Sequence, residues 1–215
     1  MRVIIADDTA LIRAGTAALL RQAGIEVAAT AADATAILSL VRQHDPDVVI
    51  LDIRMPPTFT NEGVVAAQRI RAEFPGKGVL LLSLHLDLNY ALEMVNSGEG
   101  RFGYLLKERL LDIADLVHAL HRITAGDAVI DPAIVQALMT RQRAAHTVGR
   151  LTAREHEVLG LMAEGLTNQA IGEKLHLSRK TVEAHVTRIL ERLDIPVEEG
   201  IHRRVMAILA FFESR

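Results

Sequence analysis

The feature that most constrains the fold is an alternation of short apolar runs with amphipathic stretches over the first 125 residues. The runs are "VIIA" at 3–6, "VAAT" at 27–30, "VVIL" at 48–51, "VLLLS" at 79–83 and "GYLLK" at 103–107. Helical patterns lie between and after them, at about 10–23, 33–44, 61–74, 87–97 and 110–124. Continuous apolar strands that alternate with helices are typical of a parallel sheet covered on both faces. The pattern therefore predicts an α/β domain built from five βα units.

Three acids follow two of these strands directly. Asp7 and Asp8 follow the first strand, and Asp52 follows the third. In a doubly wound sheet of the flavodoxin-like order 2-1-3-4-5, the first and third strands are neighbours, so the three carboxylates meet at the carboxyl edge. The simpler interpretation is that Asp8 or Thr9 caps the next helix and Asp7 is a solvated turn residue. Three crowded carboxylates repel one another unless a cation neutralises them, which favours a Mg²⁺ site.

Two further polar residues fall at the ends of the fourth and fifth strands. Ser83 follows "VLLL" and Lys107 follows "GYLL". With the acids, they indicate phosphoryl chemistry on a carboxylate, in which Asp52 is the nucleophile and Ser83 and Lys107 bind the phosphoryl oxygens. Separately, Ser83 suits a helix cap, Lys107 a solvated lysine and Asp52 the start of a turn. Their joint position at strand ends favours the site.

Composition narrows the class of protein. The chain has 215 residues, is 50% hydrophobic and contains no cysteine, which excludes disulfides, thiolate metal sites and cysteine nucleophiles. It has no run of uncharged apolar residues long enough to span a membrane, and the apolar run after the N-terminus is too short for a secretory signal, so we expect a cytoplasmic protein. The net charge of -3 means that any binding to DNA depends on a local basic patch.

The pattern changes after residue 124. The short "AVIDP" and the helix-like "PAIVQALMTRQR" come first, and 144–150, "AAHTVGR", lacks apolar periodicity and is predicted to be an interdomain linker. We therefore predict a domain at 1–124, a connecting helix and linker at 125–150, and a second domain at 151–215.

The second domain is predicted to contain only helices. Thr152 and Glu155 have the spacing of a capping box, and Ser178 suits the N-cap of a later helix. Two short helices joined by a tight turn there resemble a helix-turn-helix, although periodicity alone also fits a helical bundle without a ligand. The outward positions of the second helix are Lys180, Glu183, Ala184, Thr187, Arg188 and Glu191. Residues 166–192 hold five Lys+Arg and three Asp+Glu, a net of +2, which is a weak basic patch.

Through "ADD", "VVILDIRMPP", "LLLS" and "GYLLK", residues 1 to about 124 resemble a receiver domain of two-component response regulators. The resemblance implies that a sensor histidine kinase phosphorylates Asp52. The residues that it implies for Mg²⁺ are Asp7, Asp8, Asp52 and the backbone carbonyl of Arg54, and those for the switch are Ser83 and Tyr104, with Lys107 beside the phosphoryl group. Arg54 and His85 also stand where relatives modulate dephosphorylation, although both suit solvated loop residues equally well.

Residues 151–196 resemble a LuxR-type helix-turn-helix, which implies a four-helix domain that reads double-stranded DNA with helix 179–193. By position, Lys180, Thr181 and Arg188 would contact phosphates, and Glu183, Ala184 and Thr187 would face base edges. Relatives often carry basic residues at 183 and 187, so we expect altered specificity or modest affinity. The apolar residues of the last helix that would form a dimer are Val205, Ile208, Leu209 and Phe212, unless they pack on their own domain.

The whole chain thus resembles a NarL/FixJ-type response regulator. This implies a transcription factor, not a turnover enzyme, that forms a homodimer and binds DNA when Asp52 is phosphorylated. Two alternatives stay open. A Mg²⁺-dependent phosphohydrolase would usually carry a second acid where Arg54 stands, and a DNA-binding protein could carry a receiver that no longer needs phosphate.

Overall fold

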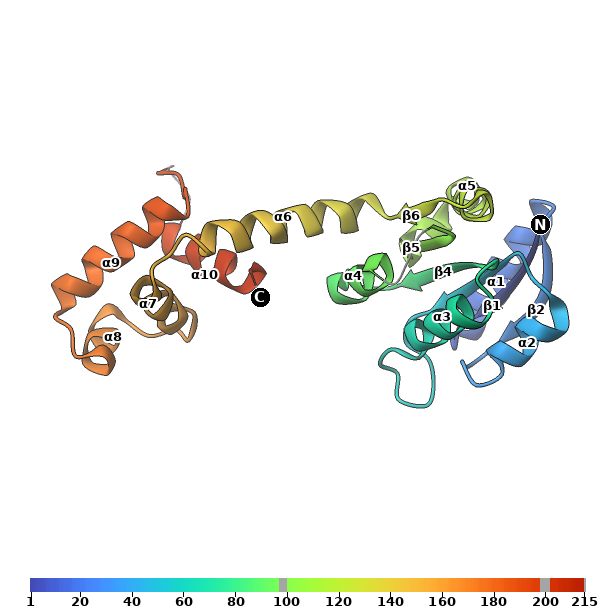
Figure 1. The fold of residues 1–215 in the computed structure, drawn as a ribbon, viewed down its shortest axis with the longest axis horizontal. Coiled ribbons are helices and arrows are strands. Elements are labelled where there is room, and N and C mark those ends of the chain that lie inside the picture. Colours follow the sequence, from blue (N-terminus) through green and yellow to red (C-terminus); the bar gives the residue numbers. More distant parts are fainter. Residues whose placement is uncertain (97–99, 198–201, 215) are drawn as a thin grey trace. The chain divides into compact units, whose positions relative to one another are not determined.

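The computed structural model describes residues 1–96, 100–197 and 202–214. The chain divides into two compact units, Met1–Val135 and Gln136–Arg215, which are described separately below (Figure 1). The N-terminal unit is α/β and the C-terminal unit contains helices, which confirms both predicted fold classes. Among the described residues, no helix combines the length and apolar character that crossing a membrane requires.

The sheet of the N-terminal unit is entirely parallel. Its strands are β1 (Arg2–Ala6), β2 (Glu26–Ala31), β3 (Val48–Asp52), β4 (Gly78–Ser83), β5 (Phe102–Leu106) and β6 (Ala128–Ile130). Their spatial order is β2-β1-β3-β4-β5-β6, which confirms the predicted order 2-1-3-4-5. The predicted number of five strands is wrong, because the three residues of β6 pair with β5, from Phe102 beside Ala128 to Tyr104 beside Ile130. A strand this short shows no apolar periodicity in the sequence.

The helices of this unit agree with the predicted patterns except at some ends. They are α1 (Ala10–Gln22), α2 (Ile37–His44), α3 (Glu62–Glu73), α4 (Leu88–Asn96) and α5 (Ile113–Ala125). The helix predicted from 33 begins at Ile37, because the Asp33 carboxylate accepts a hydrogen bond from the Thr35 amide at 2.8 Å and holds a turn. The helix predicted from 110 begins at Ile113, after a 3-10 turn η1 (Lys107–Leu111), and Asp112 caps it. The predicted end at 97 lies outside the described residues.

Buried apolar side chains cover both faces of the sheet. Polar groups are therefore left for the ends of the strands. On one face, Val3, Ile5 and Ile50 pack in a core with Leu20 of α1 and Leu120 of α5. Residues that alternate with them along the strands point to the opposite face. Helices α2 and α3 cover that face (Figure 1). The site therefore lies at the carboxyl edge, beyond the apolar layers.

The segment after α5 differs most from the prediction. The N-terminal unit extends through Val135, beyond the predicted end at 124. Asp131, fully buried, accepts hydrogen bonds from the Leu106 amide at 3.3 Å and from Arg109 Nε at 3.0 Å, so it ties the start of the next helix to β5. That helix, α6 (Pro132–Val148), covers most of the predicted linker at 144–150. The chain is helical there because alanines favour a helix and neither Gly nor Pro intervenes before Gly149. The role of 144–150 as an interdomain linker stays a prediction.

The C-terminal unit is a helical bundle around one core. Its helices after α6 are α7 (Ala153–Ala163), α8 (Asn168–Leu175), α9 (Arg179–Arg192) and α10 (Arg203–Glu213). The core joins Leu159 of α7, Ile171 of α8, Val182 of α9 and Phe211 of α10. The turn between α8 and α9 is tight, since a Cβ at Gly172 would lie 2.7 Å from the Leu177 carbonyl oxygen. These helices confirm the predicted helix-turn-helix.

Both predicted helix caps are present. The Thr152 hydroxyl accepts from the Glu155 amide while the Glu155 carboxylate accepts from the Thr152 amide at 2.8 Å, which completes the capping box of α7. The Ser178 hydroxyl accepts from the Thr181 amide at 3.1 Å and caps α9. Glu155 also pairs with Arg192 of α9. The buried Glu155 therefore joins the start of α7 to the end of α9.

Glu155→Gln is expected to weaken the C-terminal unit by about 1 to 3 kcal/mol, because the charged carboxylate accepts several hydrogen bonds while nearly buried. Burial opposes ionisation, but the Thr152 bonds and Arg192 outweigh it and hold the pKa of Glu155 below its ordinary 4.5. A lowered pKa means that this stabilisation is present above pH 4.5 and is lost as the pH falls. Amide hydrogen exchange of α7 and α9 against pH would measure both effects. The matched control is Glu157→Gln, whose side chain is 51% exposed beside Arg154.

Candidate functional site

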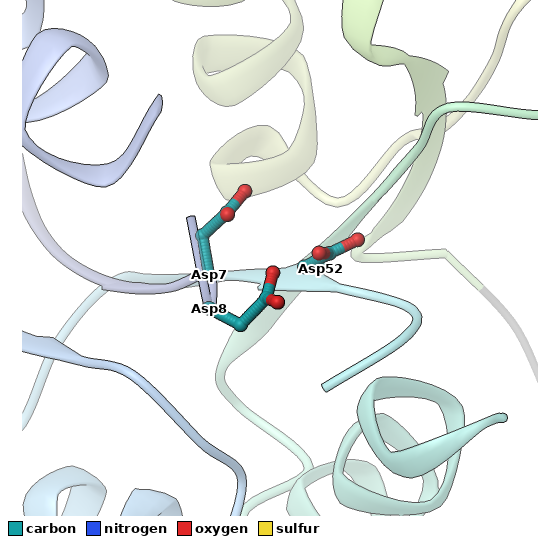
Figure 2. A group of neighbouring side chains, drawn as sticks. All are labelled: Asp7, Asp8 and Asp52. Atoms are coloured by element: carbon teal, nitrogen blue, oxygen red, sulfur yellow. The ribbon is translucent and has the colours of Figure 1, made fainter. Parts of the chain in front are cut away.

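The three predicted acids do meet at the carboxyl edge of the sheet. Because Ala6 pairs with Leu51 in the ladder between β1 and β3, Asp7 and Asp52 follow at the same level of the two strands. Asp7, Asp8 and Asp52 each offer one carboxylate oxygen, and these oxygens lie within 4.8 Å of one another (Figure 2). The Thr9 amide donates to Asp7 at 2.9 Å and so fixes its side chain.

Lys107 lies between two of the acids. Its Nζ is 2.8 Å from Asp7 Oδ2 and 2.8 Å from Asp52 Oδ2, and the three side chains are 4%, 2% and 8% exposed. Burial works against the charged ammonium group, but the hydrogen bonds to Asp52 and Asp7 outweigh it and raise the pKa of Lys107. Burial also raises the pKa of Asp52, which the Lys107 ammonium offsets only in part. The site thus holds a desolvated carboxylate beside a fixed cation.

A cavity of about 320 Å³ opens beside Asp52. Its lining residues are Asp8, Thr9, Asp52, Ile53, Arg54, Phe59, Ser83, Leu84, His85 and Lys107. Three carboxylates within reach of one point form an all-oxygen donor set, which is the kind that Mg²⁺ prefers, and the cavity leaves room for water and a phosphoryl group. The residues therefore fit a Mg²⁺ ion. Arg54 lies on the cavity wall and its amide donates to the Asp52 carboxylate. The role predicted for its carbonyl stays a prediction.

The two predicted switch residues are both buried. The Ser83 hydroxyl donates to the His85 carbonyl at 2.6 Å and accepts from the His85 amide at 3.2 Å. The Tyr104 side chain is fully buried, and its hydroxyl donates to the Asp87 carbonyl at 3.4 Å. Both residues thus hold the segment that follows β4. Ser83 binds it at His85, and Tyr104 binds it at Asp87. The strand places the Tyr104 side chain in the core and not at the surface.

Sequence reasoning missed one residue in the loop between β3 and α3, Phe59, and one in the first turn of α3, Gly63. A Cβ at Gly63 would lie 1.8 Å from the Asp52 carbonyl oxygen, so the chain returns to the end of β3 where only glycine fits. Phe59, with φ of 57°, lines the cavity. The lone aromatic among Pro, Thr and Asn residues is a visible signal, but nothing local to the sequence shows that this loop folds over Asp52.

The predicted DNA-reading face of α9 is exposed. The exposed residues are Lys180, Thr181, Glu183, Ala184, Thr187 and Arg188, whereas Val182 and Ile189 are buried in the core. Arg179 Nε pairs with Glu183 Oε1 at 2.9 Å across one turn. The sequence pattern did not single out Arg179, which places a cation beside the one acid predicted to face DNA bases.

The last helix has an exposed apolar side. Val205, Leu209 and Phe212 are 47%, 47% and 55% exposed. Ile208, predicted to lie in a dimer contact with them, is half-buried and packs against the core of its own unit. The helix thus serves its own core with one side and leaves the other side available.

Comparisons with known proteins agree with both units. Residues 3–121 match the response regulator receiver domain, and residues 149–205 match the bacterial regulatory proteins of the luxR family. The chain belongs to the NarL-type response regulators. It is therefore a DNA-binding transcription factor and not a turnover enzyme.

Similar proteins match this chain over nearly their whole length. The oxygen regulatory protein NreC of Staphylococcus carnosus is 37% identical over 205 residues, which cover 91% of this chain and 92% of NreC. A structure of the RcsB response regulator of Salmonella typhimurium covers 99% of this chain and 97% of its own, with 26% identity and a TM-score of 0.62. An RcsB–DNA complex covers 100% and 98%, with 25% identity and a TM-score of 0.57. The match to whole chains shows that both units belong to one regulator.

Proposed function

We propose that Asp52 accepts a phosphoryl group from a sensor histidine kinase in the cytoplasm, and that this promotes dimerisation and binding to double-stranded DNA. The proposal rests on one observation: Lys107 Nζ lies 2.8 Å from a carboxylate oxygen of Asp52 and 2.8 Å from one of Asp7, at the edge of the cavity. The ion bound there would be Mg²⁺, with Asp7, Asp8, Asp52 and the Arg54 carbonyl as its ligands. When bound, Mg²⁺ neutralises charge on the transferring phosphoryl group.

The residues of the chain supply the rest of the chemistry. An oxygen of Asp52 attacks the phosphorus of the kinase phosphohistidine, the bond from phosphorus to the histidine nitrogen breaks, and the imidazole leaves with that electron pair. Lys107 is already within reach of Asp52, so its ammonium group can donate to a phosphoryl oxygen as charge develops. The buried carboxylate has few water molecules to displace before it attacks.

The switch follows from competition for the Ser83 hydroxyl. Ser83 donates to the His85 carbonyl in this structure. A phosphoryl group on Asp52 adds about -1.5 to -2 charges and strong acceptor oxygens, which draw the hydroxyl into the cavity. The His85 carbonyl then loses its donor, and the segment that reaches Asp87 shifts. Tyr104, which donates to Asp87, couples this shift to β5.

DNA recognition is assigned to α9. The phosphate contacts would come from Lys180, Thr181 and Arg188, and the contacts to base edges from Glu183, Ala184 and Thr187, all of which are exposed. A dimer through the exposed side chains of Val205, Leu209 and Phe212, with Ile208 at its border, would present two such helices to two half-sites. The relative RcsB has been solved in complex with DNA and as two dimers bound to two DNAs, which supports DNA binding as a dimer.

A DNA-binding selection at fixed salt tests the proposal and finds the site at once. The chain is incubated with Mg²⁺, with or without acetyl phosphate, before random duplexes are selected. We expect one palindromic motif of two half-sites, enriched more strongly with the phosphodonor. Equal enrichment in both arms would instead support a receiver that no longer needs phosphate.

Two substitutions on α9 should act differently on the selected site. Arg188→Ala should weaken binding equally across sequences and lower the salt slope by about 1, as expected for a phosphate contact. Glu183→Gln should change the preference at one base pair by about 1 to 3 kcal/mol, because glutamate accepts from cytosine N4. Binding titrations on single-base variants of the site, at several salt concentrations, separate the two. Glu164→Gln, at an exposed pair with Lys174, is the control. An altered base preference with Arg188→Ala would contradict the assignment of Arg188 to a phosphate contact.

A further inference from the structure

The loop between β3 and α3 is tied at three consecutive peptide groups. The Thr58 amide donates to Glu62 Oε1 at 2.9 Å, the Phe59 amide to the Met55 carbonyl at 3.0 Å, and the Thr60 amide to Glu62 Oε2 at 3.0 Å. Met55 is itself fully buried. The backbone on both sides of Phe59 is therefore held by the first turn of α3 and by the core.

The Glu62 carboxylate keeps this arrangement over the whole range of physiological pH. Burial slightly opposes its ionisation, but the bonds from the Thr58 hydroxyl and from the amides of Thr58 and Thr60 lower the pKa of Glu62 to about 2. A carboxylate that stays ionised accepts from both amides at once. These bonds therefore tie the loop to the first turn of α3 wherever Glu62 is ionised.

Phe59 is an unusual residue for its backbone. Its φ of 57° lies in the left-handed region, where a bulky side chain is strained and glycine or asparagine fits better. The residue is 53% exposed, so burial offsets little of that cost. The loop alone does not explain a phenylalanine here. Phe59 does line the same cavity as Asp52, Ser83 and Lys107.

From this placement we infer that Phe59 shields the phosphoryl group on Asp52 from water and so sets the lifetime of the phosphorylated state. The inference rests on the proposed function of Asp52. Hydrolysis needs a water oxygen to attack phosphorus while the bond from phosphorus to the Asp52 oxygen breaks. Asp52 then leaves as a carboxylate, and the water proton passes to solvent with inorganic phosphate. An apolar ring on the cavity wall reduces the number of water molecules that can reach phosphorus.

The test measures decay separately from formation. The full chain and its variants are labelled with radioactive acetyl phosphate in Mg²⁺, freed of donor, and followed as the label is lost. Phe59→Gly should take up label at the same initial rate and lose it roughly three- to tenfold faster, since water then enters the cavity. Phe59→Leu should fall between, and Phe59→Trp should match or exceed the original half-life. Val65→Ala removes a half-exposed apolar side chain from α3, outside the cavity lining, and should leave the half-life of the label unchanged.

The dependence on side-chain size distinguishes shielding from a structural role. Glycine suits the φ of residue 59, so melting temperatures should stay equal or rise for Phe59→Gly. If Phe59→Gly fails to fold, the half-lives of Phe59→Leu and Phe59→Trp decide, because shielding requires the larger ring to give the longer lifetime. Equal half-lives, or slower decay in the glycine variant, would overturn the inference while leaving Asp52 as the acceptor. Failure of the unaltered chain to take up label would instead reject the proposed function.

Discussion

Asp52→Asn is expected to abolish labelling by acetyl phosphate and to remove any gain in DNA affinity that the phosphodonor produces. The amide is close in size to the carboxylate but is not a nucleophile at neutral pH. The fold should survive, because Lys107 keeps its 2.8 Å contact with Asp7. Removing a buried charge at the edge of the sheet also relieves repulsion among the three acids. The measurements are radiolabel uptake and binding to the selected DNA site.

Asp45→Asn is the matched control for that experiment. Asp45 lies on the surface of the same unit, where it pairs with Lys77, and is 81% exposed. It should label and bind DNA as the unaltered chain does. Label that persists in Asp52→Asn at the level of this control would place the acceptor on another residue and contradict the proposal.

Lys107→Met is expected to lower the free energy of unfolding of the N-terminal unit by about 3 to 5 kcal/mol, because it leaves two buried carboxylates without their cation. Millimolar Mg²⁺ should restore more stability to this variant than to the unaltered chain, since a divalent ion neutralises the same acids. Urea unfolding followed by circular dichroism, with and without Mg²⁺, measures both effects. Lys77→Met, whose partner Asp45 is 81% exposed, should cost about 1 kcal/mol or less.

The pH dependence of stability tests independently whether the charge of Lys107 stabilises the unit. Its pKa is raised above the ordinary 10.5, so its contribution to stability is fully present below that pH. The contribution is lost as the pH rises through the value in the folded state. The stability difference between Lys107→Met and the unaltered chain should therefore shrink above pH 10.5. A difference that stays constant into that range would show that packing of the side chain, and not its charge, stabilises the unit.

Much of the fold follows from local pattern. Five apolar runs separated by helical patterns leave few arrangements for a parallel sheet, so the order of the first five strands was predictable. The three residues of β6 were not, because they are a strand only through pairing with β5. The helical path of 144–148 was hidden for the opposite reason, since small and polar residues carry little periodicity although alanine favours a helix.

Part of the candidate site was also predictable from the sequence and part was not. Asp7, Asp52, Ser83 and Lys107 stand at strand ends, so strand order alone brings them to one edge. No comparable rule of topology predicts the path of the loop between β3 and α3. Gly63 touches the end of β3, and Phe59 reaches the cavity, because Glu62 and the core hold a particular loop path. Such contacts between segments depend on that path and leave no periodic signal.

The sequence by itself determined the class of fold, the acids and lysine of the proposed acceptor site, and the helix proposed to read DNA, because each depends on neighbours along the chain or on a general rule of sheet topology. The tertiary structure alone decided how these groups meet. It placed Lys107 between two carboxylates, turned Ile208 toward its own core and set Phe59 beside Asp52. Charge pairing and burial act between atoms that are close in space, and only the folded chain brings those atoms together.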